Sequence, residues 1–207
     1  MAILVTFPEV TGYYLQQNEL IKVISTPIVT RDNTMQTKHF SKIGLGGGCH
    51  WCTEGVFESL IGIILVNQGW IASTDNNAEL SEAIEVYFDQ SKVSLQTLIE
   101  IHLHTHASTA DHSMRKKYRS AIYTYDDDQN QEANKVLDAL QSDFDQPIIT
   151  QVLPFDSFKA NKDELQNYLY NSPNKPFCIT YIHPKLRLLL TRFKYQVNDE
   201  QIALCLE

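Results

Sequence analysis

Two cysteines in a glycine-rich segment are the residues of this chain best suited to chemistry. Gly46-Gly47-Gly48 precedes Cys49, and Cys52 follows three residues later, so that the two cysteines form a C-x-x-C pair. A glycine-rich turn from a strand into a helix would place Cys49 in the first helical turn, where free backbone N–H groups and the helix dipole favour a thiolate over a thiol. Oxidation of Cys49 would leave Cys52 one turn away as a resolving thiol. The pattern therefore predicts a redox-active thiol pair.

Three other interpretations of this segment stay open. The two cysteines could be small core residues without chemistry. They could hold zinc, although zinc takes four ligands, Cys178 and Cys205 form no second pair, and the nearby histidines are spread around the end of a helix. Residues 44–48 could form a dinucleotide-binding loop, but Cys49 stands where that motif has its third glycine. The histidines in question are His102, His104, His106 and His112.

A strand-like segment further along the chain offers a candidate acid. Ile84, Val86 and Phe88 alternate with less apolar residues, and Glu82 shares their parity, so its carboxyl group should point to the buried face of the strand. A buried carboxyl group is either paired or protonated, and desolvation raises its pKa, so Glu82 could serve as a general acid beside a thiolate. A glutamate that turns to solvent at the end of the strand fits the same pattern.

Aromatic and basic residues near these two features have open roles. Trp51, between the cysteines, could form an apolar wall for a small substrate, and Tyr118 could offer a phenolic hydroxyl as a hydrogen-bond donor. Ordinary packing at the entrance to a strand would also explain Tyr118. The basic run Arg115-Lys116-Lys117 is most simply a solvated loop.

Alternation and helical spacing predict the elements that position these residues. Ser94 is a typical N-cap for the helix that follows it. From Lys42 to Thr124 the order of elements is β-α-β-β-α-β, the split arrangement of ferredoxin-like folds, with two helices on one face of a mixed sheet. We therefore predict an α+β two-layer sandwich. The expected strands are residues 42–45, 63–70, 82–88, 120–124 and 148–153, and the expected helices are residues 49–60, 95–102, 129–144 and 163–170.

Length and composition limit the class of protein. The 207 residues carry 17 Lys and Arg against 25 Asp and Glu, and the net charge of −8 argues against broad binding to nucleic acid or to anionic membranes. Four cysteines are too few for a disulfide scaffold, and no apolar stretch is long enough for a bilayer span, so we expect a soluble, cytoplasmic protein. Residues 1–41 sustain no period and are predicted to be an extension packed on or around one catalytic domain, residues 42–207, which ends in a C-terminal tail.

The segment G-C-H-W-C-T-E at residues 48–54, followed by Phe57, resembles the G-C-F-W-x-x-E-x-x-F signature of A-type peptide methionine sulfoxide reductases. The resemblance extends over residues 42–194 and includes residues 82–89 and the helix that ends at His106. It also includes Gly69-Trp70, residues 118–123 and 169–173, Phe177-Cys178 and residues 184–186.

This resemblance implies a reaction and a role for several residues. Cys49 would attack the sulfur of methionine S-sulfoxide, free or in proteins, and release methionine, which would repair oxidised proteins. Glu82 would protonate the sulfoxide oxygen, and Tyr118 would donate a hydrogen bond to it. His50 and Trp51 would form the pocket for the S-methyl group.

The same resemblance implies how the reduced enzyme is regenerated. Cys49 would be left as a sulfenic acid, and either Cys52 or Cys178, which both match cysteines of relatives, would convert it to a disulfide. We expect Cys52 to act first and Cys178 to relay the disulfide outward, where thioredoxin or another dithiol would reduce it. Cys205 has no matching position. The reaction would need no metal and no organic cofactor.

The chain departs from the family pattern at several places. His50 replaces the usual phenylalanine, which makes one wall of the pocket polar and titratable. The segment between Trp70 and Glu82 is short and lacks a tyrosine that helps to hold the oxygen. The loop before Tyr118 is altered, and Asp111 is the candidate for the family's aspartate at the substrate. Two alternative functions therefore stay open, a non-catalytic redox sensor or binder of oxidised methionine, and a general disulfide oxidoreductase.

Overall fold

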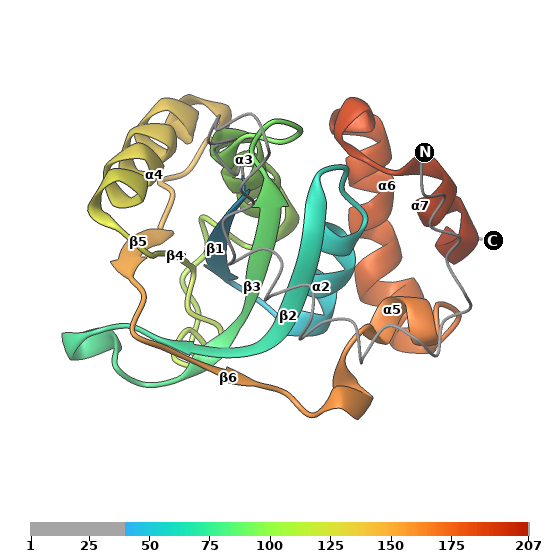
Figure 1. Cartoon of the computed structure of the whole chain (residues 1–207), viewed down its shortest axis with the longest axis horizontal. Helices are drawn as coiled ribbons and strands as arrows, with labels where there is room; N and C mark the ends of the chain where they lie inside the picture. The colour runs from blue at the N-terminus through green and yellow to red at the C-terminus, as the bar shows by residue number, and fades with distance from the viewer. Residues whose placement is uncertain (1–39, 207) are drawn as a thin grey trace, which may run out of the picture. The chain divides into compact units, whose positions relative to one another are not determined.

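A six-stranded mixed sheet organises the part of the chain that the computed structural model describes, residues 40–206 (Figure 1). Its strands are ordered β5-β4-β1-β3-β2-β6. β5 is parallel to β4, whereas β4 pairs with β1, and β2 pairs with β3 and β6, in antiparallel ladders. The strands are β1 Phe40–Gly46, β2 Ile63–Ala72, β3 Ser81–Asp89, β4 Ala121–Thr124, β5 Gln151–Pro154 and β6 Ser157–Ala160.

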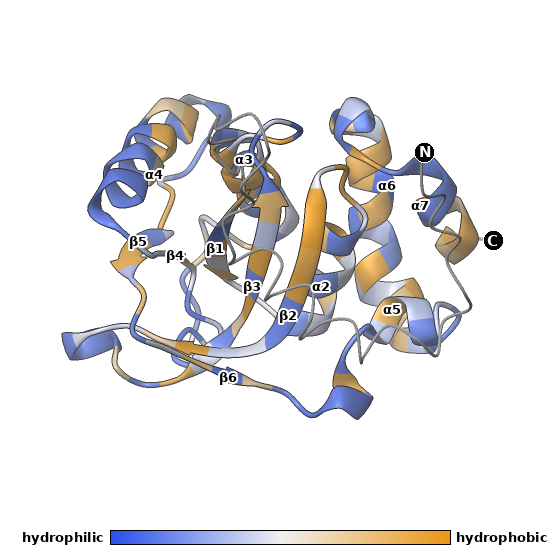
Figure 2. Ribbon diagram, in the orientation of Figure 1, coloured by the Kyte–Doolittle hydropathy of each residue, from blue (hydrophilic) through white to orange (hydrophobic). Residues whose placement is uncertain are grey.

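Helices pack on the sheet and on one another. α2 contacts β2 and β3, and α4 contacts β4 and β5. α3 contacts both α2 and α4, and α6, near the C-terminus of the chain, contacts α2 and α3. Apolar residues alternate with polar ones along β3 and occupy the first half of β2, whereas much of the surface of α4 is polar (Figure 2). The helices are α2 His50–Glu58, α3 Leu95–Thr105, α4 Asp127–Leu140, α5 Tyr168–Asn171, α6 His183–Arg192 and α7 Asp199–Leu206.

The chain divides into two units, Met1–Phe40 and Ser41–Glu207. The extension predicted for residues 1–41 lies outside the described residues, except for its last two positions. Within the described part of the second unit, no helix combines the length and the apolar character that crossing a bilayer requires.

The predicted β-α-β-β-α-β core is confirmed. β1, α2, β2, β3, α3 and β4 follow one another along the chain, and their strands lie side by side as β4-β1-β3-β2. Ser94 caps α3 as expected, because its hydroxyl oxygen accepts a hydrogen bond from the Thr97 N–H at 3.1 Å. The helix expected over residues 129–144 is α4, which ends at Leu140 and continues as a 3-10 turn, Gln141–Asp143.

The helix predicted over residues 163–170 is wrong. Asp163–Leu165 form a 3-10 turn, and the short helix α5 begins only at Tyr168. Between them Asn167 has a φ of 54°, a left-handed conformation through which an α-helix cannot continue. The N–H of Asn167 donates to Glu54 Oε1 at 2.7 Å. A buried carboxylate from α2 therefore redirects the chain, which helical spacing alone cannot indicate.

Both faces of β3 are buried, whereas the alternation in the sequence indicates only one. Glu85, on the opposite face from Glu82, is 6% exposed, and its Oε1 accepts a hydrogen bond from the Tyr125 hydroxyl at 2.5 Å. Lys42 Nζ lies 3.7 Å from the same carboxylate oxygen and 3.9 Å from the centre of the Tyr125 ring. A period of two thus places Glu82 correctly but does not reveal that charged and aromatic groups cover the second face.

Candidate active site

Cys49 lies where β1 passes through glycines into α2. It is the N-cap residue of α2, and its carbonyl oxygen accepts hydrogen bonds from the N–H groups of Cys52 and Thr53, at 3.0 and 3.2 Å. Gly47 lets this turn approach α3, because a Cβ atom at Gly47 would lie 2.4 Å from the ring of His106. Cys49 therefore occupies the helix start that the sequence predicts, beside N–H groups without helical partners.

The surroundings shift the pKa values of the two thiols in opposite directions. The pKa of Cys49 is lowered to about 7, chiefly by a hydrogen bond from the Cys52 thiol, which with the backbone N–H groups of Trp51 and Cys52 outweighs burial. The same hydrogen bond and burial raise the pKa of Cys52. At neutral pH, Cys49 is therefore the member of the pair that forms a thiolate, and Cys52 is the thiol that donates to it.

The two thiols line a cavity of about 540 Å³. Tyr118, a predicted site residue, lines the same cavity, together with Phe177 and Lys185. The wall is mostly apolar, with a few polar groups, as is typical of small-molecule sites. Asp111, the candidate for the family's aspartate, does not line this cavity and is exposed. A small substrate would thus meet the Cys49 thiolate, a phenol and an ammonium in one cavity, whose lining does not include the predicted site residues Glu82, His50 and Trp51.

Trp51 belongs to an aromatic wall beside the cysteines. Its indole ring stacks on Tyr168, with ring centres 4.3 Å apart and planes 8° apart, and it meets Phe177 edge-on at 5.5 Å. The ring of His50 is 5.8 Å away and nearly perpendicular to it. Trp51 therefore lies against the ring of His50 and against two aromatic residues from the C-terminal part of the chain, and the pocket predicted for the S-methyl group stays a prediction.

Glu82 is 5% exposed and faces hydrogen-bond donors from two residues. Lys117 Nζ lies 3.1 Å from Oε1, the backbone N–H of His50 donates to Oε2 at 3.2 Å, and His50 Nδ1 lies 3.0 Å from Oε2. Burial alone raises the pKa of Glu82, but the hydrogen bonds from the side chain and backbone of His50 and from Lys117 outweigh burial and leave the pKa lowered. Of the two states expected for a buried carboxyl group, the structure has the paired one.

The hydrogen bonds around His50 fix which ring nitrogen carries the proton. Trp70 Nε1 can only donate, and it lies 2.9 Å from Asn161 Oδ1. The amide group of Asn161 therefore turns its Nδ2 toward His50 Nε2, at 3.0 Å. Because Nδ2 is a donor, His50 Nε2 accepts, and the ring proton is on Nδ1, the nitrogen that faces Glu82.

Buried polar side chains continue from Asn161 to the C-terminal part of the site. Asn161 Nδ2 also donates to Gln68 Oε1 at 2.6 Å, and Gln68 Nε2 donates to Glu54 Oε2 at 2.8 Å. Glu54 accepts in addition from the N–H groups of Asn167 and Tyr168, at 2.7 and 3.1 Å. The glutamate that follows the two cysteines in the sequence thus holds the segment that carries Tyr168.

Replacement of Asn161 by leucine tests this network. The change leaves Trp70 Nε1, His50 Nε2 and Gln68 Oε1 without their partner, and each buried polar group left unpaired costs about 1–3 kcal/mol. We expect urea denaturation to show a loss of stability of that order. Nitrogen NMR should find the His50 proton on Nδ1 in the unmodified protein and distributed over both nitrogens in the variant. Asn134→Leu, on the exposed side of α4, is the control, and a proton on Nε2 in the unmodified protein would contradict the assignment.

Arg115 ties the loop before β4 to the glycine turn. Its guanidinium donates to the carbonyl oxygens of Gly47 and Tyr118, at 3.2 and 3.1 Å. It donates also to the carbonyl oxygens of Ala107 and Ala110. The interpretation of the basic run as a solvated loop is therefore wrong at Arg115, whose side chain fixes the backbone on two sides of the cavity.

The Arg115→Ala variant is expected to loosen this wall of the cavity. Gly47 and Tyr118 lose a common hydrogen-bond donor, and small displacements of groups that position a substrate weaken its binding. We expect the KM for a substrate of this cavity to rise about tenfold, with a smaller change in kcat. Lys116→Ala, on the same loop but exposed, is the matched control. An unchanged KM in Arg115→Ala would show that the loop keeps its position without the arginine.

The other two cysteines are buried. The thiol of Cys178 donates to the carbonyl oxygen of Ser172 at 3.4 Å, and burial raises the pKa of Cys178. The pKa of Cys205, in α7, is raised to about 11, first by burial and then by the nearby Cys178 and Glu58. All four cysteines are unpaired. Cys49 is the one cysteine whose surroundings lower its pKa.

The histidines near the end of α3 do not join the cysteines. His102 Nε2 donates to the carbonyl oxygen of Gly46 at 2.9 Å, and burial lowers the pKa of His102 to about 4. His106 Nδ1 donates to the carbonyl oxygen of His102 at 2.6 Å, and His106 Nε2 lies 2.7 Å from the Ser120 hydroxyl. Both rings are therefore neutral and tied into the structure that supports the cavity.

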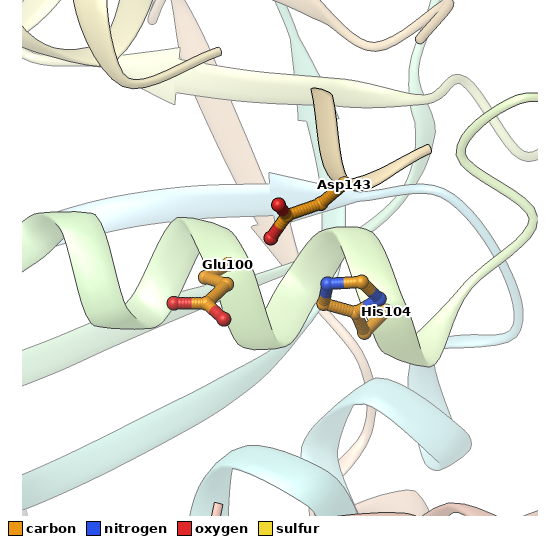
Figure 3. Close-up of side chains that lie close together, drawn as sticks. All are labelled: Glu100, His104 and Asp143. Carbon is orange, nitrogen blue, oxygen red and sulfur yellow. The ribbon is translucent and has the colours of Figure 1, made fainter. Parts of the chain in front are cut away.

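Figure 3 shows the group of possible metal ligands found among residues 40–206, namely Glu100, His104 and Asp143, whose ligand atoms all lie within 4.8 Å of one another. The group contains no cysteine. Arg192 Nη2 lies 3.9 and 3.4 Å from the carboxylates of Glu100 and Asp143, and so supplies a positive charge there. Within the described residues, the zinc interpretation of the cysteine pair therefore finds no further ligands.

Comparisons with known proteins agree with this arrangement. A family model described as peptide methionine sulfoxide reductase matches residues 41–197. The chain is 31% identical over 172 residues to the peptide methionine sulfoxide reductase MsrA of Trichodesmium erythraeum. The aligned residues cover 75% of this chain and 97% of that protein.

Two solved structures share the fold. Methionine sulfoxide reductase A of Corynebacterium diphtheriae superposes with a TM-score of 0.57 and 24% identity, covering 71% of this chain and 82% of that one. Mxr1 of Saccharomyces cerevisiae in complex with Trx2 superposes with a TM-score of 0.51 and 18% identity, covering 66% of this chain and 91% of that one. The family match runs through β1, α2 and β3, which are the elements that place Cys49 and Glu82. The chain therefore belongs to the peptide methionine sulfoxide reductase family, A type, and is an oxidoreductase that reduces methionine sulfoxide in the repair of proteins.

Proposed function

We propose that the protein reduces the S-epimer of methionine sulfoxide, free or in proteins, with Cys49 as the nucleophile. The Cys49 thiolate attacks the sulfoxide sulfur, the oxygen passes to Cys49 with the uptake of one proton, and methionine leaves. A sulfoxide and a thiolate thus give a thioether and a sulfenic acid. The observation that carries this proposal is the lowered pKa of Cys49, about 7, in a cavity that it shares with Tyr118.

Glu82 supplies the proton for the sulfoxide oxygen in this proposal, and Tyr118 donates a hydrogen bond to it. In the free protein the pKa of Glu82 is lowered by His50 and Lys117, so its carboxyl group is ionised. A bound substrate displaces water, which raises the pKa of a carboxyl group and lets it take up a proton and pass it on. Trp51 and His50 receive the methyl group. Asp111 is exposed and does not line the cavity, and none of these steps depends on it.

Two further cysteines return the enzyme to its starting state. Cys52 attacks the sulfenic sulfur of Cys49 to form the first disulfide with loss of water, and Cys178 passes the disulfide on by thiol exchange. Thioredoxin reduces the final disulfide, a partner supported by the yeast Mxr1 structure in complex with Trx2. The cysteines carry the electrons, so the reaction needs no metal and no organic cofactor. The place of action is the cytoplasm, during oxidative stress.

One assay tests the reaction, its stereochemistry and its nucleophile together. The protein and its Cys49→Ser variant are incubated with racemic methionine sulfoxide and dithiothreitol, and the two epimers that remain are separated by chiral chromatography. Loss of the S-epimer alone, in the unmodified protein alone, is the expected result. Survival of both epimers would favour a redox sensor or a binder of oxidised methionine. Reduction of insulin disulfides without loss of sulfoxide would favour a general disulfide oxidoreductase.

A further inference from the structure

Lys185 is a basic residue beside the reactive cysteines that the steps above do not use. It lies in the first turn of α6, after Pro184, and its side chain lines the same cavity as Cys49 and Cys52. Lys185 Nζ donates to the carbonyl oxygen of Thr105 at the end of α3. This bond holds the ammonium where α6 meets α3, and α6 packs against α2 as well.

No carboxylate balances the charge of this ammonium. Among residues 40–206, Lys185 forms no ion pair with an aspartate or a glutamate. Burial lowers the pKa of Lys185, and the thiolates that Cys52 and Cys49 can form raise it. The neighbouring rings of His102 and His106 are neutral, because burial lowers the pKa of both. The anions that can pair with Lys185 are therefore those of the cysteine pair.

Formation of the first disulfide needs both a base and an acid at this place. Cys52 attacks best as a thiolate, yet its hydrogen bond to Cys49 and its burial raise its pKa. The oxygen of the Cys49 sulfenic acid leaves far more easily as water than as hydroxide, so it has to receive a proton. Lys185 lines the cavity of both thiols, and burial lowers its pKa, which makes its ammonium a better proton donor and lets its amine take a proton back.

We propose that Lys185 is a catalytic residue of disulfide formation, an inference that rests on the proposed role of Cys52 as the first resolving thiol. The Cys52 sulfur forms a bond to the Cys49 sulfur as the S–O bond breaks. The Lys185 ammonium gives a proton to the departing oxygen, which leaves as water, and the resulting amine takes the thiol proton of Cys52. A sulfenic acid and a thiol thus give a disulfide and water, and Lys185 ends in the form in which it began.

A single turnover without external reductant isolates this step. Reduced protein is mixed with methionine sulfoxide, and released methionine, remaining thiols and dimedone-trapped sulfenic acid are followed over time. In Lys185→Met we expect disulfide formation to slow about a hundredfold and sulfenic acid to accumulate after methionine is released. Lys185→Arg keeps the charge but cannot exchange a proton, so we expect it to be as slow. Lys135→Met, on the exposed side of α4, is the matched control.

The variants separate failure of this inference from failure of the route through Cys52. Disulfide formation at the unmodified rate in Lys185→Met or in Lys185→Arg would overturn proton transfer by Lys185. Cys52→Ser should accumulate sulfenic acid whatever the role of Lys185. A disulfide formed as fast in Cys52→Ser as in the unmodified protein would overturn the route through Cys52, and with it the inference on Lys185.

Discussion

Cys49→Ser is expected to abolish methionine formation from methionine sulfoxide, with a loss of at least about a thousandfold. A serine hydroxyl stays protonated at neutral pH, whereas the surroundings of Cys49 lower its pKa to about 7 and so provide a thiolate. Methionine released in a single turnover, measured by chromatography, is the readout. Cys205→Ser is the matched control and should keep its activity, because Cys205 is buried in α7 and its pKa is raised. Unchanged turnover in Cys49→Ser would place the nucleophile at another residue.

The pH dependence of this first step has a definite sign. The thiolate is the reactive form of Cys49, and its share grows as the pH rises through about 7. The rate of methionine formation should therefore increase about tenfold between about pH 6 and about pH 8 and then level off. A rate that falls over this interval would mean that another group, and not the Cys49 thiolate, limits the step.

Glu82→Gln is expected to lower the rate of methionine formation about a hundredfold or more. Glutamine keeps the shape of the side chain, but it neither carries a proton to the sulfoxide oxygen nor balances the charge of Lys117, 3.1 Å away. Glu85→Gln is a matched control on the same strand, because Glu85 is equally buried but faces Tyr125 on the opposite side of the sheet. Equal losses in the two variants would point to damage to β3, and no loss in Glu82→Gln would remove Glu82 from the reaction.

Glu82 also makes the stability of the protein depend on pH. Its pKa in the folded protein is lowered from the ordinary 4.5, so its ionised form stabilises the fold. This contribution is fully present above the unfolded pKa and is lost as the pH falls through the lowered value. The unfolding free energy of Glu82→Gln should therefore fall less than that of the unmodified protein when the pH is lowered below 4.5, which urea denaturation at a series of pH values can measure.

The core of the sheet and the positions of Cys49 and Glu82 could be predicted because patterns of neighbouring residues determine them. Glycines before Cys49 and helical spacing after it are enough to place a thiol at a helix start. The parity of Glu82 is enough to bury its carboxyl group on the core side of β3. Both inferences need only residues that are close together in the sequence.

The partners of these groups could not be predicted because they come from distant parts of the chain. Asn161 lies 111 residues from His50, in an irregular segment, and no period or motif distinguishes it from other asparagines. Lys117 stands in a basic run that composition alone describes as solvated, yet it pairs with Glu82. Lys185 follows a proline that marks the start of a helix, but this signal does not show which cavity the lysine lines. The ionised state of Glu82 follows from such contacts and not from its burial, which alone gives the opposite direction.

The two polar contacts of the His50 ring, with Glu82 and with Asn161, bear on how this site can change during evolution. A phenylalanine at position 50 would take a donor from Glu82 and an acceptor from Asn161 in a single substitution. Glu82 would keep the backbone N–H of residue 50 and the ammonium of Lys117, and Asn161 Nδ2 would keep Gln68 Oε1. The cost is therefore that of two lost hydrogen bonds, each about 0.5–1.5 kcal/mol, with no buried group left without a partner. Histidine at position 50 can therefore be exchanged for phenylalanine in a single substitution, because the partners that Glu82 and Asn161 retain soften the change.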